Sequence, residues 1–130
     1  MNESDITDQE LSALVPKNYK GLVVNFHGKL RDDISNFHSK PEDLDWGFEM
    51  TNNINYFIEG HEYSYGVKLN AVTCKELYCE VLITEKERPS WDRIYHSMIK
   101  QNWWKFTSIN SSSSDDLKSE STLIYYFLFI

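Results

Sequence analysis

The only two cysteines of the chain, Cys74 and Cys79, constrain its fold more than any other feature. They lie in the stretch "AVTCKELYCEVLITE", where four residues separate them between two apolar runs. If these runs are strands joined by the loop "KELY", the cysteines stand opposite each other across a hairpin. Opposed Cβ atoms in such a pair are about 4.5–5.5 Å apart, which is close to the separation that a disulfide needs.

The cysteine pair has three interpretations, namely a disulfide, two reduced thiols in the core, or part of a metal or redox site. A thioredoxin-like redox motif has two residues between its cysteines. A structural zinc ion needs four ligands, and the histidines are scattered singly, as His27, His38, His61 and His96. We therefore favour the disulfide, and we expect neither a metal nor a cofactor. Because disulfides persist in oxidising compartments, this choice also favours export over a cytoplasmic location.

The sequence around the cysteines predicts two strands, at residues 65–74 and 78–85. The second alternates between two sets of side chains, as a strand with two different faces does. Its two sets are Cys79, Val81 and Ile83, and Tyr78, Glu80 and Leu82. In the first strand the alternation changes phase near Asn70 and Ala71. One extra residue flips the alternation, so we expect a β-bulge there.

Two further segments have the apolar period of a helix. The first begins near Pro41, where Ser39 and Glu42 resemble a capping box, and Gly60 can close it. The second spans residues 88–101. We expect the apolar stripes of both helices to lie in the core; their members are Trp46, Met50, Ile54 and Phe57, and Trp91, Ile94, Tyr95 and Met98.

The remaining segments complete a single predicted domain, residues 1–130. A polar N-terminal arm with a helical turn at "DQELSALV" spans residues 1–20, and an extended segment and connection spans 21–40. The α+β core spans 41–130, with strands at "WWKFTSI" and "STLIYYFLFI" and a mobile loop at 110–121 between them. The order α-β-β-α-β-β predicts a four-stranded antiparallel sheet with two helices packed on one face. A fifth strand is added if residues 21–26 pair at an edge.

The charge of the chain favours some partners over others. The formal net charge is −7, and no cluster of Lys and Arg is visible. Nucleic acids and anionic membranes are therefore poor partners, whereas a basic protein is a reasonable one. The alternative is that the charge only keeps the domain in solution. The longest apolar run, "LIYYFLFI", is far shorter than the roughly 20 residues of a membrane-spanning helix, so we expect no membrane insertion. The oligomeric state is open, with a homodimer as one option.

The segment from Glu42 to Ile83 resembles a family of small exported bacterial proteins of uncharacterised function. The shared features are "EDLDW" at the start of the helix, the hairpin "KLNAVTCKELYCEVLI", and an apolar final strand. The resemblance implies a periplasmic α+β domain and no reaction. Members of this family carry an upstream signal, which this chain lacks, so we expect that the signal has been removed.

Candidates for catalysis are few in this sequence. It has no glycine-rich phosphate loop, no G-x-S-x-G motif and no H-E-x-x-H motif. The stretch "EGHEY" places His61 between Glu59 and Glu62, which would suit a small hydrolase only if the three side chains lined a pocket. We expect a protein without catalytic activity and keep this hydrolase as a third hypothesis.

The candidate binding surface is the face of the sheet opposite the helices. We assign to it Tyr78, Leu82, Trp103, Lys105 and Tyr126. An exposed apolar patch of this width marks an interaction site, unless residues 21–26 lie across it. The first functional hypothesis is therefore an extracytoplasmic protein–protein interaction module or an accessory protein of the bacterial envelope. The alternative is an immunity-type inhibitor that neutralises a basic secreted toxin.

Overall fold

The computed structural model describes residues 6–114 and 121–130. The chain divides into two compact units, Met1–Pro41 and Glu42–Ile130. We predicted that residues 1–130 form a single domain, and this stays a prediction.

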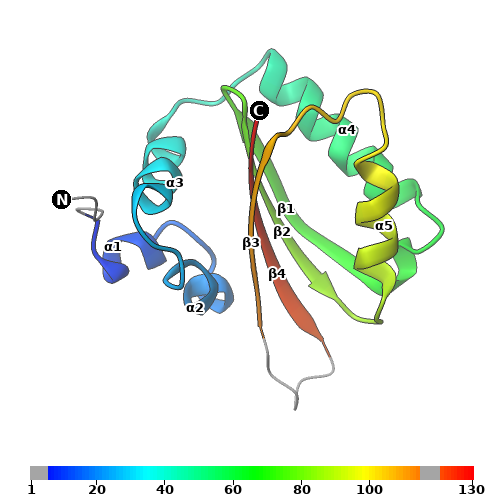
Figure 1. The fold of residues 1–130 in the computed structure, drawn as a ribbon, viewed down its shortest axis with the longest axis horizontal. Helices are drawn as coiled ribbons and strands as arrows, with labels where there is room; N and C mark the ends of the chain where they lie inside the picture. The colour runs from blue at the N-terminus through cyan, green and yellow to red at the C-terminus, as the bar shows by residue number, and fades with distance from the viewer. Residues whose placement is uncertain (1–5, 115–120) are drawn as a thin grey trace. The chain divides into compact units, whose positions relative to one another are not determined.

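The first unit is helical among its described residues. It contains α1 (Asp8–Ser12), a short 3-10 helix (Lys17–Tyr19), α2 (Lys20–Val23) and α3 (Lys29–Ser39), as Figure 1 shows. The helical turn that we predicted at "DQELSALV" is confirmed by α1.

The prediction of an extended segment and a connection at residues 21–40 was wrong, because this region is largely helical. The run "GLVV" has β-branched residues but is too short to fix a period, and Leu22 and Val23 are buried from α2. Gly28 follows with φ 66°, a left-handed conformation that glycine adopts without a Cβ penalty. The chain then turns into α3, which buries Ile34 and Phe37 at helical spacing.

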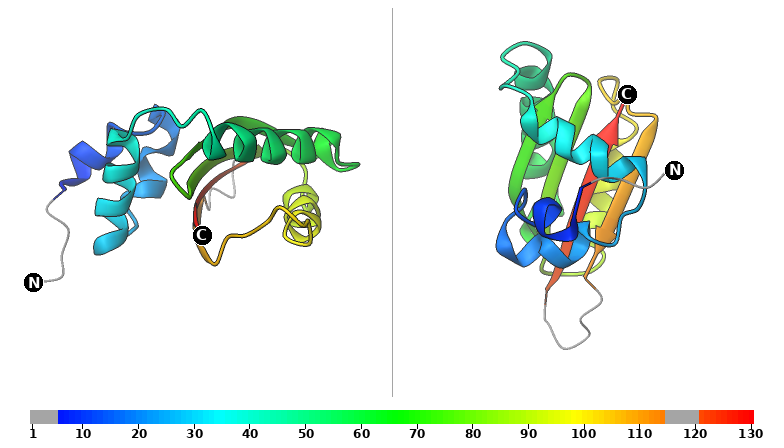
Figure 2. Two further views of the ribbon diagram at one scale, coloured as in Figure 1. Left: turned by 90° about the horizontal axis from the view of Figure 1, so that it is seen from above. Right: turned by 90° about the vertical axis from the view of Figure 1, so that its left-hand side faces the viewer.

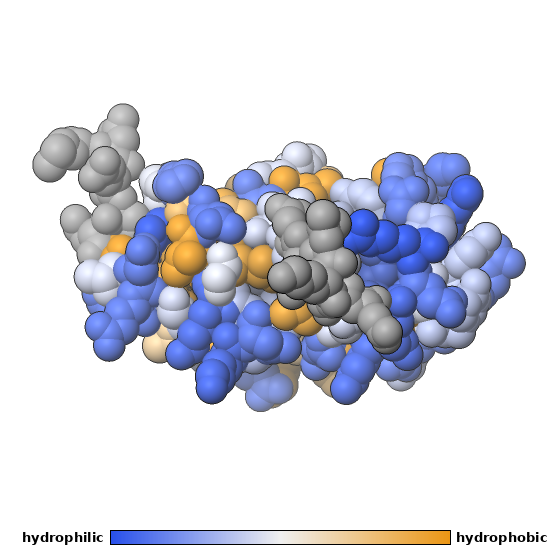
Figure 3. Space-filling view, turned by 90° about the horizontal axis from the view of Figure 1, so that it is seen from below, coloured by the Kyte–Doolittle hydropathy of each residue, from blue (hydrophilic) through white to orange (hydrophobic). Residues whose placement is uncertain are grey.

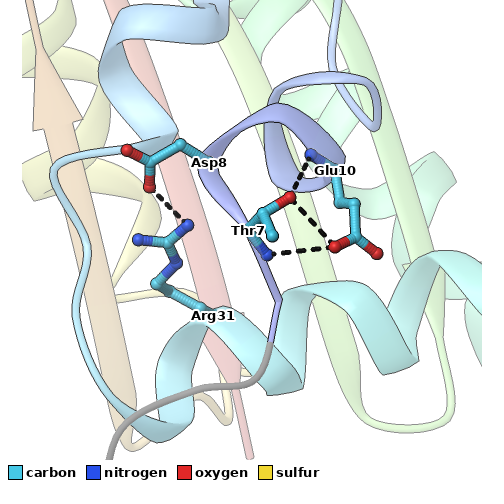
Figure 4. A network of polar contacts seen from close by, with 4 residues as sticks. All are labelled: Thr7, Asp8, Glu10 and Arg31. Carbon is cyan, nitrogen blue, oxygen red and sulfur yellow. Dashed lines mark hydrogen bonds and ion pairs between the residues drawn. The ribbon is translucent and has the colours of Figure 1, made fainter.

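Polar contacts hold the short helix α1 in place within the first unit (Figure 4). The hydroxyl of Thr7 accepts the backbone N–H of Glu10 at 3.1 Å, and the Glu10 carboxylate accepts the Thr7 N–H at 3.3 Å. This reciprocal pair is a capping box. An ion pair of 2.6 Å joins Asp8 of α1 to Arg31 of α3. A five-residue helix is unstable alone, and these contacts support it together with the burial of Leu11.

The second unit has the α+β fold that the sequence predicted. Its described residues form a four-stranded antiparallel sheet in the order β1-β2-β4-β3. Helices α4 and α5 pack against one face of this sheet, as the two ribbon views agree (Figures 1 and 2). The bounds are α4 Trp46–Gly60, β1 Val67–Lys75, β2 Tyr78–Glu85, α5 Ser90–Met98, β3 Ser108–Ser113 and β4 Thr122–Phe129.

The core of this unit lies between the sheet and the two helices. The predicted helical stripes are confirmed there, with Met50 and Ile54 buried from α4 and Ile94 and Met98 buried from α5. Trp46 and Phe57 are partly buried and pack against the same cluster. The sheet contributes the set of β2 side chains that includes Val81 and Ile83, and β4 contributes Ile124 and Leu128.

The β1–β2 hairpin confirms three details of the prediction. Cys74 pairs with Cys79 in the strand register, and the two form a disulfide. The register shifts between Leu69 and Ala71, which is the expected bulge. The turn is tighter than the loop "KELY", because only Glu76 and Leu77 lie outside the strands, and both have positive φ.

The predicted start of the first long helix was wrong. Ser39 ends α3, and its hydroxyl bonds back to the Ser35 carbonyl at 3.1 Å. Helix α4 begins five residues later than Pro41, at Trp46. The carboxylate of Asp43 has the capping role that we predicted for Ser39, because it interacts with the backbone N–H groups of Asp45 and Gly47.

The third strand also differs from the prediction at "WWKFTSI". Strand β3 begins at Ser108 and includes serines that we had assigned to a mobile loop at 110–121. Pairing with β4 satisfies the backbone hydrogen bonds of this segment, whatever its side chains are. A low-complexity sequence does not reveal such pairing. Residues 115–120 of the predicted loop lie outside the described residues. Trp103 and Trp104 pack against the core from the preceding loop instead.

None of the helices in the described part of the chain is long and apolar enough to cross a membrane.

Candidate functional site

The five residues of the predicted binding surface do not share one face of the sheet. Tyr78 stacks on Phe129 with ring centroids 4.4 Å apart, on the face opposite the helices. Trp103 and Tyr126 lie on the helix side, because Trp103 contacts Phe57 of α4 and both pack against the core. Lys105 is exposed in the loop that follows Trp103. The five therefore do not form one continuous patch, and their role in binding stays a prediction.

The face that carries Leu82 holds a polar pair that the sequence did not reveal. The Tyr125 hydroxyl donates to the Glu80 carboxylate at 2.6 Å, and both residues are buried. Burial and the neighbouring Glu80 charge raise the pKa of Tyr125, so the phenol stays a hydrogen-bond donor. Leu82 and Phe127 are buried as well.

The "EGHEY" cluster places its histidine in a structural position. The backbone N–H of Tyr63 donates to Nδ1 of His61 at 3.1 Å. In the neutral ring, Nε2 then carries the proton, and it lies 3.2 Å from the Ser97 hydroxyl, which itself donates to the Arg93 carbonyl. This histidine donates to Ser97 and is not placed to take its proton. Glu59 and Glu62 are exposed. That the protein is not an enzyme stays a prediction.

A cavity of about 230 Å³ lies where the end of β2, the start of α5 and the middle of β4 meet. We call it the acidic aromatic pocket. Its lining residues are Glu85, Arg88, Pro89, Trp91, Asp92, Tyr95 and Tyr126.

Three aromatic rings form the wall of the acidic aromatic pocket. Trp91 and Tyr126 meet edge to face, with centroids 5.6 Å apart and planes at 75°. Tyr95 lies 5.3 Å from Tyr126 and 6.1 Å from Trp91, at 49° and 42°. The faces of aromatic rings carry the negative side of the quadrupole, and a cation placed over such a face is attracted to it.

Two carboxylates complete the pocket at different depths. Glu85 is buried, and its carboxylate accepts the backbone N–H of Trp91 at 2.8 Å, which caps the first turn of α5. Asp92 is exposed on the same turn and lies 3.2 Å from His96. The guanidinium of Arg88 stands 4.0 Å from Glu85 and donates to Thr122, so one cation is already present at the rim.

The tyrosines of the pocket are held in their neutral form. Burial raises the pKa of Tyr126, a hydrogen bond with the Trp91 indole opposes this, and the Asp92 charge adds to it. Burial and Tyr126 also raise the pKa of Tyr95.

A second cavity of similar volume lies between α4 and β1, beside Asp43, Phe48 and Val72. Its charged lining residues are Glu42, Asp43 and Lys75, and Asp43 already accepts the N–H groups of Asp45 and Glu76. Only one aromatic ring, that of Phe48, lines it, against three in the acidic aromatic pocket. We therefore regard the acidic aromatic pocket as the better candidate site.

The sequence identified only part of this pocket. Trp91 and Tyr95 were assigned to the core, and Tyr126 to a surface on the other face. Glu85 and Asp92 were missed, although Asp92 occupies the first turn after a proline, where acidic residues favour the helix dipole. In the part of the chain that the structure describes, no three His, Cys, Asp or Glu side chains gather as a metal site.

Comparison of the chain with protein-family models, with curated proteins and with solved structures gave no match. The disulfide hairpin is thus the confirmed part of the resemblance to small exported bacterial proteins, and the family itself stays a prediction.

Proposed function

We propose that the protein is an extracytoplasmic protein–protein interaction module that binds a basic partner and catalyses no reaction. The observation that carries this proposal is the acidic aromatic pocket, in which three rings and two carboxylates converge on one cavity. Buried aromatic groups at the centre of an interface supply much of its binding energy, and carboxylates around them select for positive charge.

The charge of the whole chain supports the same partner class. A net charge of −7 attracts a basic protein over a distance and speeds its association at low salt. Hydrophilic residues predominate on the face drawn in Figure 3. Interfaces commonly combine an apolar anchor with a polar rim.

The proposed location outside the cytoplasm rests on the disulfide. The Cys74–Cys79 bridge is the kind of bond that persists in oxidising compartments and is rare in the cytosol. The resemblance of the hairpin region to exported bacterial proteins points the same way.

An immunity-type inhibitor is the alternative form of this function. It would use the same pocket against a basic secreted toxin, so the identity of the partner distinguishes it from an accessory protein of the envelope. Inhibition of the partner's toxicity by the chain would assign the inhibitor.

Affinity capture from the periplasmic and membrane fractions of the source cells tests the proposal, with the disulfide-intact chain as bait. Asp92→Lys reverses a charge at the pocket, and Glu59→Lys makes the same change at an exposed carboxylate of α4. We expect a basic partner that is retained by the Glu59→Lys chain and lost from the Asp92→Lys chain. A partner that is acidic, or that both variants retain equally, would contradict the proposal.

A further inference from the structure

We propose that the acidic aromatic pocket binds one primary ammonium group, presented as a lysine side chain on the partner polypeptide. This inference rests on the proposed function and specifies the group that the pocket receives. Three features of the pocket carry it, namely its size, the angles between its rings and its charges.

The size of the pocket fits a single side chain. Its volume is about 230 Å³, whereas pockets for drug-sized ligands are roughly 300–1,000 Å³. A lysine has a slender aliphatic stem that can lie along apolar surface while its charged end reaches polar groups. The rings of Trp91, Tyr95 and Tyr126 provide that apolar surface.

The angles between the rings favour an ammonium over a guanidinium. No two of the three rings are parallel, since their planes meet at 75°, 49° and 42°. A planar guanidinium stacks on one aromatic face at a time, whereas an ammonium is a compact point charge. A compact cation can therefore approach more than one ring of this wall.

The two carboxylates of the pocket can accept hydrogen bonds from the ammonium group, and one cation of the chain competes for them. Glu85 accepts a hydrogen bond from the Trp91 backbone, and the exposed carboxylate of Asp92 lines the same pocket, 3.2 Å from His96. Arg88 is the competitor, since its guanidinium stands 4.0 Å from Glu85 and its side chain is largely exposed. The distance between Arg88 and Glu85 is long for an ion pair. A lysine ammonium would therefore share Glu85 with Arg88 or displace Arg88 from it.

Three capped amino acids serve as probes of the pocket: Nα-acetyl-lysine methylamide, Nα-acetyl-arginine methylamide and Nα-acetyl-norleucine methylamide. The indole N–H signals of the 4 Trp residues are followed by two-dimensional NMR during titration of the whole chain. We expect the lysine probe to shift the Trp91 signal with millimolar affinity and to leave the Trp46 signal unchanged. The arginine probe should bind more weakly, and the norleucine probe should not bind.

Three variants locate the cation. Asp92→Asn should weaken binding of the lysine probe by about two- to fivefold, as expected for loss of one exposed charge contact. Arg88→Gln should strengthen binding of the lysine probe, because the competing cation is removed. Glu59→Gln is the matched control and should change nothing. Thermal melts of each variant establish that it is folded.

Equal binding of the norleucine probe, tighter binding of the arginine probe, or weaker binding in the Arg88→Gln chain would each overturn the inference. No shift of the Trp91 signal with any probe would overturn it as well. The capture experiment separates this failure from that of the proposed function: a basic partner lost from the Asp92→Lys chain would still support the function.

Discussion

The backbone N–H of Glu76 donates to the carboxylate of Asp43 at 3.0 Å, and this bond joins the segment before α4 to the tip of the β1–β2 hairpin. The same carboxylate accepts the N–H of Asp45 at 3.0 Å and interacts with the N–H of Gly47. One side chain thus fixes both the start of a helix and a tight turn far away in sequence.

Replacement of Asp43 by Asn should lower the melting temperature of the chain at neutral pH. The backbone hydrogen bonds lower the pKa of Asp43 from its ordinary value of 3.8. A lowered pKa in the folded state means that the stabilisation is present above the unfolded pKa and is lost as the pH falls through the folded pKa. The melting temperatures of wild type and variant should therefore converge at acidic pH. Glu49→Gln, an exposed change on α4, serves as the control, and a difference that persists undiminished in acid would contradict this explanation.

Replacement of Leu77 by Gly should leave the free energy of unfolding unchanged or raise it by up to about 1 kcal/mol. A left-handed backbone conformation costs a non-glycine residue roughly 1–2 kcal/mol, and glycine avoids this cost. Part of the gain is offset because glycine loses more conformational entropy on folding. Leu77 has φ 74° and is substantially exposed, so its side chain contributes little packing. Urea unfolding measures the change. Leu69→Gly in β1 is the matched control and should destabilise the chain. Clear destabilisation by Leu77→Gly would show that the side chain itself is needed at the turn.

Replacement of Cys74 and Cys79 together by Ala should lower the free energy of unfolding by about 2 kcal/mol, the chain-entropy value for so short a loop. The sheet register pairs these residues without the bridge, so the fold should be retained. Reduction of the wild-type chain should have a similar effect. Intact mass after alkylation, with and without prior reduction, reports the bridge in protein taken from cells, and free thiols without reduction would count against export.

Replacement of Ile54 by Ala should cost about 2–5 kcal/mol, the usual range for a fully buried aliphatic side chain. Ile54 is 0% exposed at the centre of the core cluster. Tyr56→Ala on the same helix is the matched comparison, because Tyr56 is 72% exposed, and it should change stability by no more than about 0.5 kcal/mol. Similar costs for the two variants would mean that the face of α4 has been assigned wrongly.

The parts of the fold that sequence reasoning predicted well have a local period. The alternation of β2 and its phase change in β1 gave the hairpin, the bulge and the disulfide pair. The stripes of α4 and α5 gave the core, because apolar residues recur at helical spacing over several turns.

The parts that it missed depend on partners far away in sequence. Strand β3 is rich in serine and is a strand only because β4 offers it a pairing edge. The acidic aromatic pocket combines Glu85, the first turn of α5 and Tyr126. Nothing local in the sequence reports that these three come together. Helices α2 and α3 were missed for a different reason. The β-branched run in α2 favoured an extended segment, and in α3 Ile34 and Phe37 alone gave only a weak helical period.

The measurement that tests the central claim most directly is the footprint of the captured partner on this chain, mapped by amide hydrogen exchange with and without the partner. The account predicts that the partner slows exchange at the end of β2, in the first turns of α5 and around Tyr126 in β4. Protection confined to the cavity beside Asp43 and Phe48, or to strand residues on the face of Tyr78 and Leu82, would contradict the assignment of the acidic aromatic pocket as the binding site.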